Sequence, residues 1–155
     1  MIKTSVAILF LIIPLIFFSC ISSEKKVNGS NKIKLPNKYN LKFLGYNSDI
    51  DNPENDRRSY YKIFINKVEM GRTTIGLESQ IKLHQLKLNV NNHLLRVEKW
   101  VLDQKSGRYK KLNNIYQPKP NFFYFSIPEN KIIIIKMKTG KYRKTMFTKE
   151  FEYDK

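Results

Sequence analysis

The sequence contains one cysteine, one tryptophan and two histidines among its 155 residues. A single thiol excludes an internal disulfide, so the folded part must be stabilised by an ordinary hydrophobic core. The histidines, His84 and His93, occur without a Gly-x-Ser-x-Gly motif, and nucleophilic catalysis needs a base beside an activated Ser or Cys. Structural zinc usually needs about four ligands close together. We therefore expect no enzymatic activity, no catalytic residue, no metal site and no cofactor.

Acidic residues are also scarce, with 13 Asp and Glu against 29 Lys and Arg. The resulting charge of +16 predicts attraction to anionic partners such as phospholipid headgroups, sulfated glycans or nucleic acid. Lys outnumbers Arg 23 to 6, however, and dedicated phosphate or sulfate sites favour the planar fork of Arg. An abundance of Lys, Asn and Ile also fits compositional bias. Both interpretations stay open, and nucleic acid is not an expected partner.

Carboxylates cluster in one run only, residues 47 to 58, which holds Asp49, Asp51, Glu54 and Asp56. Oxygen ligands at alternate positions suit Ca²⁺. The glycine and the final bidentate Glu of a calcium loop are missing, and Pro53 changes the path of the chain. We expect a solvated loop.

Long apolar runs are confined to the N-terminus, where residues 6 to 18 follow a single charge at Lys3. The order of charge, apolar centre and small residue, Ser19, is typical of a secretory signal peptide. The run is shorter than the roughly 20 residues that span a bilayer, and Pro14 interrupts it. We predict a removed leader at residues 1–19, a flexible polar tether at 20–37 and one folded domain at 38–155.

The apolar leader ends in Ser19 and Cys20, which resembles the lipobox of bacterial lipoproteins. In the common form a Leu stands three residues before the cysteine, where this chain has Phe17, followed by Phe18. The sequence is similar to the relaxed lipobox of spirochaete lipoproteins, the Borrelia type especially. The resemblance implies cleavage between Ser19 and Cys20, acylation of Cys20 and a lipid anchor in the cell envelope, facing the periplasm or the cell exterior. Two or three acyl chains make such anchoring effectively permanent.

Strand patterns dominate the remainder. Leu41, Phe43 and Gly45 share one face of a segment, as do Tyr61, Ile63 and Ile65, and four consecutive isoleucines at 132–135 suit a buried strand. We predict an all-β, antiparallel sandwich of seven to eight strands. Turns are expected at Asn66-Lys67, Asn91-Asn92, Gly107, residues 128–131 and Thr139-Gly140.

Two finer expectations concern residues 81–102. A phase slip between Leu83 and Leu86 predicts a bulge. The Asn91-Asn92 pair predicts that the strands before and after it form a hairpin. Trp100 is expected in the core.

Residues 61–100 resemble the small PEGA-type β-sandwich domains of bacterial envelope proteins, through Gly71 and Thr73 or Thr74 in the turn after the first hairpin. The resemblance implies an Ig-like or PEGA-like sandwich and does not imply a function.

Aromatic residues gather in residues 116–125, close to a lysine and two prolines. Exposed rings near basic groups form stacking platforms, so Tyr116, Lys119, Phe122 and Tyr124 are the candidate ligand-binding edge, with half-buried core strand as the alternative. We expect a non-enzymatic binding module on the envelope for an anionic macromolecule or a host or envelope protein. The alternative is a periplasmic structural or assembly accessory that pairs with envelope proteins by sheet-edge addition.

Overall fold

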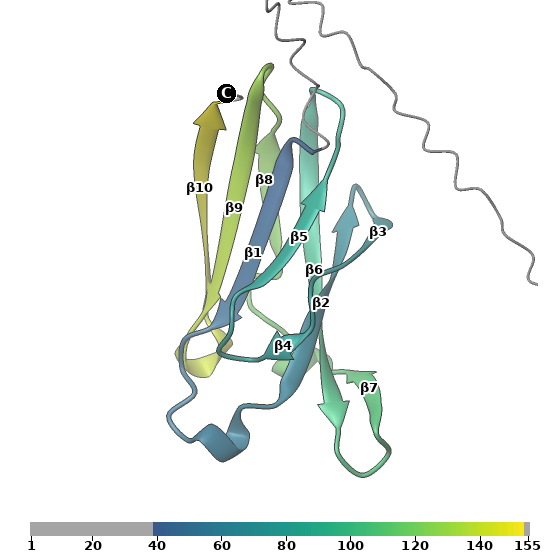
Figure 1. Cartoon of the computed structure of the whole chain (residues 1–155), viewed down its shortest axis with the longest axis vertical. Coiled ribbons are helices and arrows are strands. Elements are labelled where there is room, and N and C mark those ends of the chain that lie inside the picture. Colours follow the sequence, from purple (N-terminus) through teal and green to yellow (C-terminus); the bar gives the residue numbers. More distant parts are fainter. Residues whose placement is uncertain (1–38, 154–155) are drawn as a thin grey trace, which may run out of the picture. The chain divides into compact units, whose positions relative to one another are not determined.

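A computed structural model describes residues 39–153 of the chain. The predicted leader, Cys20 and the tether lie outside these residues. The described part forms ten strands and three short 3-10 turns (Figure 1). The strands are β1 (Leu41–Asn47), β2 (Arg58–Ile65), β3 (Val68–Arg72), β4 (Gly76–Leu77), β5 (Lys82–Leu86), β6 (Asn92–Asp103), β7 (Arg108–Lys111), β8 (Phe122–Ser126), β9 (Lys131–Thr139) and β10 (Thr145–Tyr153). The turns are η1 (Pro53–Asn55), η2 (Asn114–Tyr116) and η3 (Lys141–Arg143).

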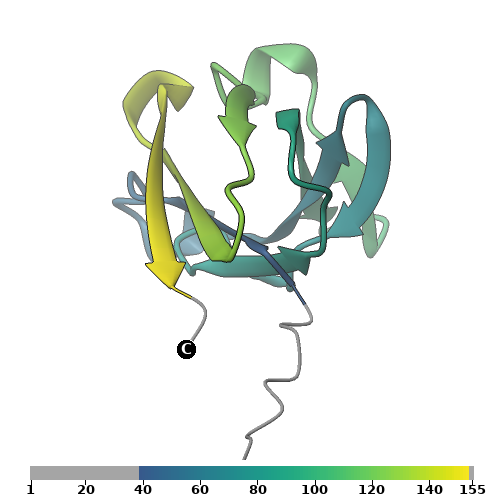
Figure 2. The ribbon, with the colours of Figure 1, turned by 90° about the horizontal axis from the view of Figure 1, so that it is seen from above.

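The strands make two sheets that share one interior, as Figure 2 shows from above. The four-stranded sheet has the order β10-β9-β1-β5. The six-stranded sheet has the order β3-β2-β6-β7, with β4 also paired to β2 and β8 to the beginning of β6. The all-β sandwich expected from the sequence is confirmed. All pairs are antiparallel except β1 with β9, which run parallel with Leu41 beside Ile133 and Asn47 beside Thr139.

Alternating side chains from both sheets fill the core, as the sequence pattern predicted. Leu41 and Phe43 from β1 pack with Tyr61 and Ile63 from β2, and all four are fully buried. Each apolar side chain of this size stabilises the fold by about 1.5–3 kcal/mol when it leaves water. The other core residues are Ile65, Leu86, Leu95, Val97, Phe125, Ile127, Ile133, Ile135 and Met137. The isoleucine run of β9 is buried at all four positions.

Three of the predicted turns join neighbouring paired strands. Asn66 and Lys67 have φ of 50° and 73°, the left-handed values that a two-residue hairpin between β2 and β3 requires. Gly107 has φ of 64° in the β6–β7 hairpin. The Thr139-Gly140 turn leads from β9 into β10.

The expected hairpin at Asn91-Asn92 is wrong. β5 pairs with β1 in one sheet and β6 pairs with β2 in the other, so the two asparagines lie on a crossover between sheets. The predicted bulge is also wrong, because β5 pairs with β1 in unbroken register. The apparent phase slip arises because Lys82 and His84 stand opposite the inward positions Gly45 and Phe43.

Trp100 is not a core residue, contrary to expectation. It pairs with Tyr60 on the outer face of the six-stranded sheet, where the two rings stack with centroids 6.0 Å apart and 9° between planes. The Lys62 ammonium lies 4.8 Å from the Trp100 ring centroid. The indole is therefore packed against Tyr60 and Lys62 on the outside of the sheet and not in the core.

Residues 39–153 contain no helix that is long and apolar enough to cross a bilayer.

Candidate functional site

The four residues of the predicted binding edge are all exposed, but they fall into two groups. Tyr116 ends η2 and Lys119 follows it in the loop before β8. Phe122 and Tyr124 lie on β8, with side chains on the outer face of the six-stranded sheet. The loop and the strand therefore present two neighbouring surfaces.

The loop group meets the β9–β10 turn. The Lys119 N–H donates to the Arg143 carbonyl oxygen at 3.0 Å, and the Thr145 N–H donates to the Lys119 carbonyl oxygen at 2.8 Å. This short parallel bridge joins two segments about 25 residues apart in sequence and gathers five cationic side chains at one end of the sandwich. We call this the basic end; its residues are Lys119, Lys138, Lys141, Arg143 and Lys144, with the rings of Tyr116 and Tyr142.

The turn itself has an uncommon backbone. Tyr142 and Arg143 have φ of 52° and 64°, and the Lys144 N–H closes the turn on the Lys141 carbonyl oxygen at 3.1 Å. Left-handed backbone at bulky residues costs about 1 kcal/mol or more each and is frequent at functional sites. The conformation leaves the Tyr142 side chain 93% exposed and brings the Arg143 guanidinium 5.1 Å from the Tyr116 ring centroid.

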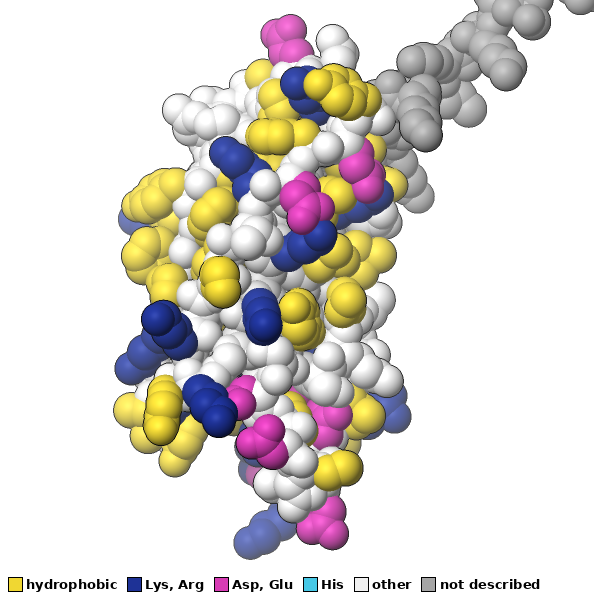
Figure 3. All heavy atoms as spheres, turned by 90° about the vertical axis from the view of Figure 1, so that its left-hand side faces the viewer, with side chains coloured by type: hydrophobic (Ala, Val, Ile, Leu, Met, Phe, Trp, Pro, Cys, Tyr) yellow, Lys and Arg dark blue, Asp and Glu magenta, His cyan; other side chains and the backbone are white. Residues whose placement is uncertain are grey.

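The charges of the basic end are unbalanced. Residues 130 to 149 contain seven Lys or Arg and no Asp or Glu. Ser48 bonds to Thr139, so the acidic loop begins nearby, yet within residues 39–153 no carboxylate forms an ion pair with any of the five cations. In Figure 3, which faces this side, basic side chains gather toward the lower left among hydrophobic ones.

A cleft of about 470 Å³ opens at the basic end. Lys138, Lys141 and Lys144 line it together with Tyr142 and Met146. Lysine stems and apolar side chains form its walls, while the ammonium groups reach water. The arrangement suits a ligand that combines negative charge with flat or apolar surface.

The strand group lies on an aromatic and basic row. Phe122 and Tyr124 contact edge to face, with ring centroids 6.2 Å apart. Arg96 on β6 stands beside Phe122, and its guanidinium lies 3.9 Å from the Phe64 ring centroid. Arg96 also pairs with Glu98 at 2.6 Å, so its charge is partly compensated. The basic end therefore offers more free positive charge than β8 does.

The basic end lies far from Tyr39, where the described chain begins. Ile133 pairs with Leu41, close to Tyr39, whereas the turn after Thr139 lies beyond Asn47 at the other end of β1. Seven strand residues separate the two ends, which corresponds to roughly 20 Å. The cations are thus presented away from the end at which the predicted tether joins.

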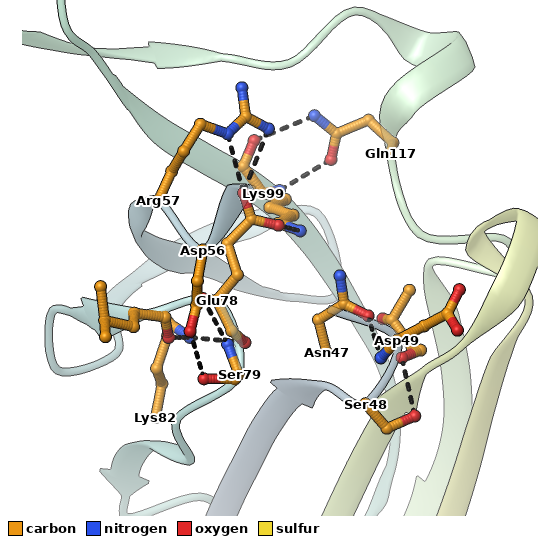
Figure 4. Close-up of polar contacts among 12 residues, drawn as sticks. Asn47, Ser48, Asp49, Asp56, Arg57, Glu78, Ser79, Lys82, Lys99 and Gln117 are labelled. Carbon is orange, nitrogen blue, oxygen red and sulfur yellow. Dashed lines mark hydrogen bonds and ion pairs between the residues drawn. The ribbon is translucent and has the colours of Figure 1, made fainter. Parts of the chain in front are cut away.

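A second charged cluster is buried and has a structural role (Figure 4). The Glu78 carboxylate lies between Lys99, which it contacts closely, and Arg57, whose Nη2 is 3.1 Å away. Lys82 donates to three backbone carbonyls, those of Leu77, Glu78 and Gln80. Glu78, Lys82 and Lys99 are almost fully excluded from water. The cluster ties the segment between β4 and β5 to the sheets and offers no access to a ligand.

Burial in this cluster shifts two titrating groups. Desolvation, together with the neighbouring Lys99 charge, lowers the pKa of Lys82 to about 8, against the attraction of Glu78 and Asp56. Desolvation raises the pKa of Tyr61, and the Glu78 charge adds to the effect. Both shifts follow from burial and do not mark an accessible acid or base.

The two histidines lie in different sheets. His93 is buried against Phe125 and its ring nitrogens contact Asn89 O and Asn66 Nδ2 at 2.9 and 3.2 Å. His84 contacts the Met70 carbonyl oxygen at 3.1 Å. Among the described residues, no three His, Cys, Asp or Glu side chains are grouped so that they could hold a metal ion.

Comparison of the chain with known protein families, curated proteins and solved structures finds no match. The binding site is therefore inferred from the geometry and charge of this chain alone. Sequence reasoning singled out Tyr116 and Lys119 but named no residue of the β9–β10 turn as a binding residue. The run from Lys136 to Lys144, with five cations in nine residues, was the available signal.

Proposed function

We propose that this protein is a lipid-anchored, non-enzymatic binding module of the bacterial cell envelope, and that its basic end binds an anionic polymer. The observation that carries the proposal is the gathering, around two exposed tyrosines, of five cations that form no ion pair with any described residue. Separated exposed charges are largely screened at physiological salt, so a cluster is needed to hold a polyanion. Exposed rings beside such cations provide flat surfaces for sugar rings.

The anchor in this proposal is acylated Cys20, left at the N-terminus after residues 1–19 are removed. The tether of residues 20–37 could reach several tens of ångströms if fully extended, at about 3.3 Å per residue. A module held in this way meets polymers outside its own membrane. The binding site lies at the end of the domain opposite Tyr39, which favours contact with such a polymer.

Binding is tested with dextran sulfate as the probe and neutral dextran as its control. The test variant carries Lys141→Gln, Arg143→Gln and Lys144→Gln. Exposed charge pairs contribute about 0.2–1 kcal/mol each, so the variant should bind about tenfold more weakly. Affinity of the wild type should fall steeply with added salt.

A second triple variant separates the site from net charge. Lys67→Gln, Lys105→Gln and Arg108→Gln remove the same charge from exposed positions on the β2–β3 and β6–β7 turns. If both variants lose affinity equally, non-specific attraction explains the binding and the site is wrong. Salt-insensitive binding would also contradict it.

The location is tested by protease accessibility on intact cells, with Cys20→Ala as the comparison. Shaving of the wild-type protein from intact cells would place it on the cell surface. Protection until the outer membrane is opened would place it in the periplasm. Release of the wild-type protein and the Cys20→Ala variant in equal amounts into the soluble fraction would refute the lipid anchor.

A further inference from the structure

Strands β8 and β10 leave two free sheet edges that face each other. β8 pairs only with β6, and β10 pairs only with β9, within the described residues. The two strands begin together at the Lys119–Lys144 bridge and run in the same direction. Beyond that bridge no backbone hydrogen bond joins them in the part of the chain described.

The opposite seam of the sandwich is closed. There the Thr74 N–H donates to the Leu83 carbonyl oxygen at 2.9 Å, and the Leu83 N–H donates to the Thr74 hydroxyl at 3.0 Å. His84 adds a contact to the Met70 carbonyl oxygen. The open seam between β8 and β10 is therefore a local feature and not a general property of the fold.

The direction of the free backbone groups on β10 follows from its first residue. The Thr145 N–H points to Lys119, away from β9. Alternate residues of a strand direct their N–H and C=O groups to the same side. Phe147, Lys149 and Phe151 therefore direct theirs into the open seam.

The same reasoning applies to β8. The Asn121 carbonyl oxygen accepts a hydrogen bond from the β6 side, and the Ile127 N–H donates one to the same side. Phe122, Tyr124 and Ser126 alternate with them, so their backbone groups face the seam. Unpaired edges of this kind act as templates for another strand.

The inner face of β10 is exposed to solvent over the second half of the strand. Phe147 stacks on Phe123 with centroids 5.3 Å apart, which closes the seam near its start. Phe151 lies beside the fully buried Ile133 on β9, yet it is 46% exposed, and Tyr153 is 74% exposed. A cleft of about 480 Å³ separates Lys149 from the edge of β8. Within residues 39–153, the sandwich thus has a core-facing surface without a covering strand.

Charge on the two faces of β10 differs. Glu150 and Glu152 bond to Lys136 and Lys42 on the outer face. On the inner face, Lys149 lies 5.5 Å from the Phe151 ring centroid and forms no ion pair among the described residues. The open seam is therefore apolar and positive.

We propose that the free edge of β10 accepts an extended segment of another protein, which adds as a strand and carries alternating apolar and acidic side chains. Main-chain hydrogen bonds to β10 provide affinity, as in other strand-addition complexes. The apolar side chains cover Phe151 and Tyr153, and an acidic side chain reaches Lys149. This site is independent of polymer binding at the basic end.

The test uses the full-length protein in mild detergent and a displayed library of random ten-residue peptides. We expect enriched peptides with period-two alternation of apolar and acidic residues. Their binding should slow amide hydrogen exchange at Phe147, Lys149 and Phe151. This exchange measurement needs no variant, so it stands even if a substitution unfolds the protein.

Lys149→Pro removes a free-edge donor without breaking the ladder to β9, and we expect it to weaken peptide binding about tenfold. Lys149→Ala removes the ammonium and its aliphatic stem but keeps the backbone N–H, and it should weaken binding less. Enriched peptides without the alternation, or unchanged exchange on β10, would overturn the proposal. So would protection that rises with protein concentration alone, because a second copy would then occupy the edge. Loss of peptide binding in the basic-end triple variant, with Lys149→Pro unaffected, would also overturn it.

Discussion

The substitution Glu78→Gln tests how the buried charge cluster stabilises the fold. Glu78 is 3% exposed and, among residues 39–153, is the only carboxylate that forms an ion pair with Lys99, which is also buried. Gln keeps the shape but leaves the Lys99 ammonium buried without a counter-charge. Removal of one partner from a buried pair costs about 3–5 kcal/mol, a large part of the 5–15 kcal/mol that stabilises a typical domain.

The exposed pair between Glu69 and Lys62 provides the matched control. Its charged atoms are 3.1 Å apart, and the Glu69 side chain is 47% exposed. Glu69→Gln should therefore cost less than about 1 kcal/mol. The two variants delete the same charge, so the difference between them measures the effect of burial.

Urea unfolding followed by the fluorescence of Trp100, the sole tryptophan, gives the free energy of unfolding. Addition of Lys99→Met to Glu78→Gln should recover most of the loss, because replacing both charges of a buried pair is often neutral. Equal destabilisation by Glu78→Gln and Glu69→Gln would refute the reasoning. Failure of the double variant to recover stability would show that Glu78 acts mainly through Arg57.

Two further predictions concern the same end of the core. Lys82 has a pKa of about 8 in the folded protein against 10.5 when exposed, so between these values only the unfolded chain holds the proton. The free energy of unfolding should therefore rise by roughly 1–3 kcal/mol as pH increases from about 8 toward 10. The Lys82→Met variant should show no such rise when both proteins are unfolded in urea. Gly45→Ala places a Cβ 2.9 Å from Tyr61 Cε2 and 3.0 Å from Phe43 Cε1. Because both rings are fully buried, we expect the free energy of unfolding, measured by thermal or urea unfolding, to fall by about 1–3 kcal/mol. An unchanged free energy would show that the two rings can move aside.

Strand identity was predictable where one face is apolar throughout. The alternation in β1 and β2 places the correct side chains inward, and the isoleucine run marks β9. Asn66-Lys67 marks its hairpin correctly, because both residues adopt left-handed backbone. Local pattern and turn chemistry suffice for these elements.

Pairing between sheets was not predictable by the same means. Asn91-Asn92 has the composition of a hairpin turn, yet the flanking strands separate into different sheets. A turn signal describes the local backbone and does not state which strand becomes the neighbour. Lys82 points inward although it is charged, because its ammonium donates to three carbonyl oxygens of the adjoining loop. Hydrophobic periodicity cannot reveal such bonds, so it does not identify the inward face of this strand.

The basic end was only half predictable for a similar reason. The cations of residues 136–144 are visible in the sequence, and so are the rings of residues 116–125. Their meeting depends on one parallel bridge between Lys119 and Lys144. Contacts of this kind are set by the packing of whole sheets and carry no local sequence signal.

The two proposed surfaces lie toward opposite ends of β10, and this separation makes a last prediction. The basic end adjoins Thr145, whereas Phe151 and Tyr153 lie toward the end near Tyr39. Lys149, the cation of the peptide site, is four strand residues from Thr145, or about 13 Å, which exceeds the Debye length of about 8 Å at physiological salt. A short sulfated oligosaccharide and a strand-forming peptide should therefore bind together. We expect saturation with the oligosaccharide to change peptide affinity less than twofold, measured by fluorescence anisotropy of labelled peptide; strict competition would mean that both ligands use one site.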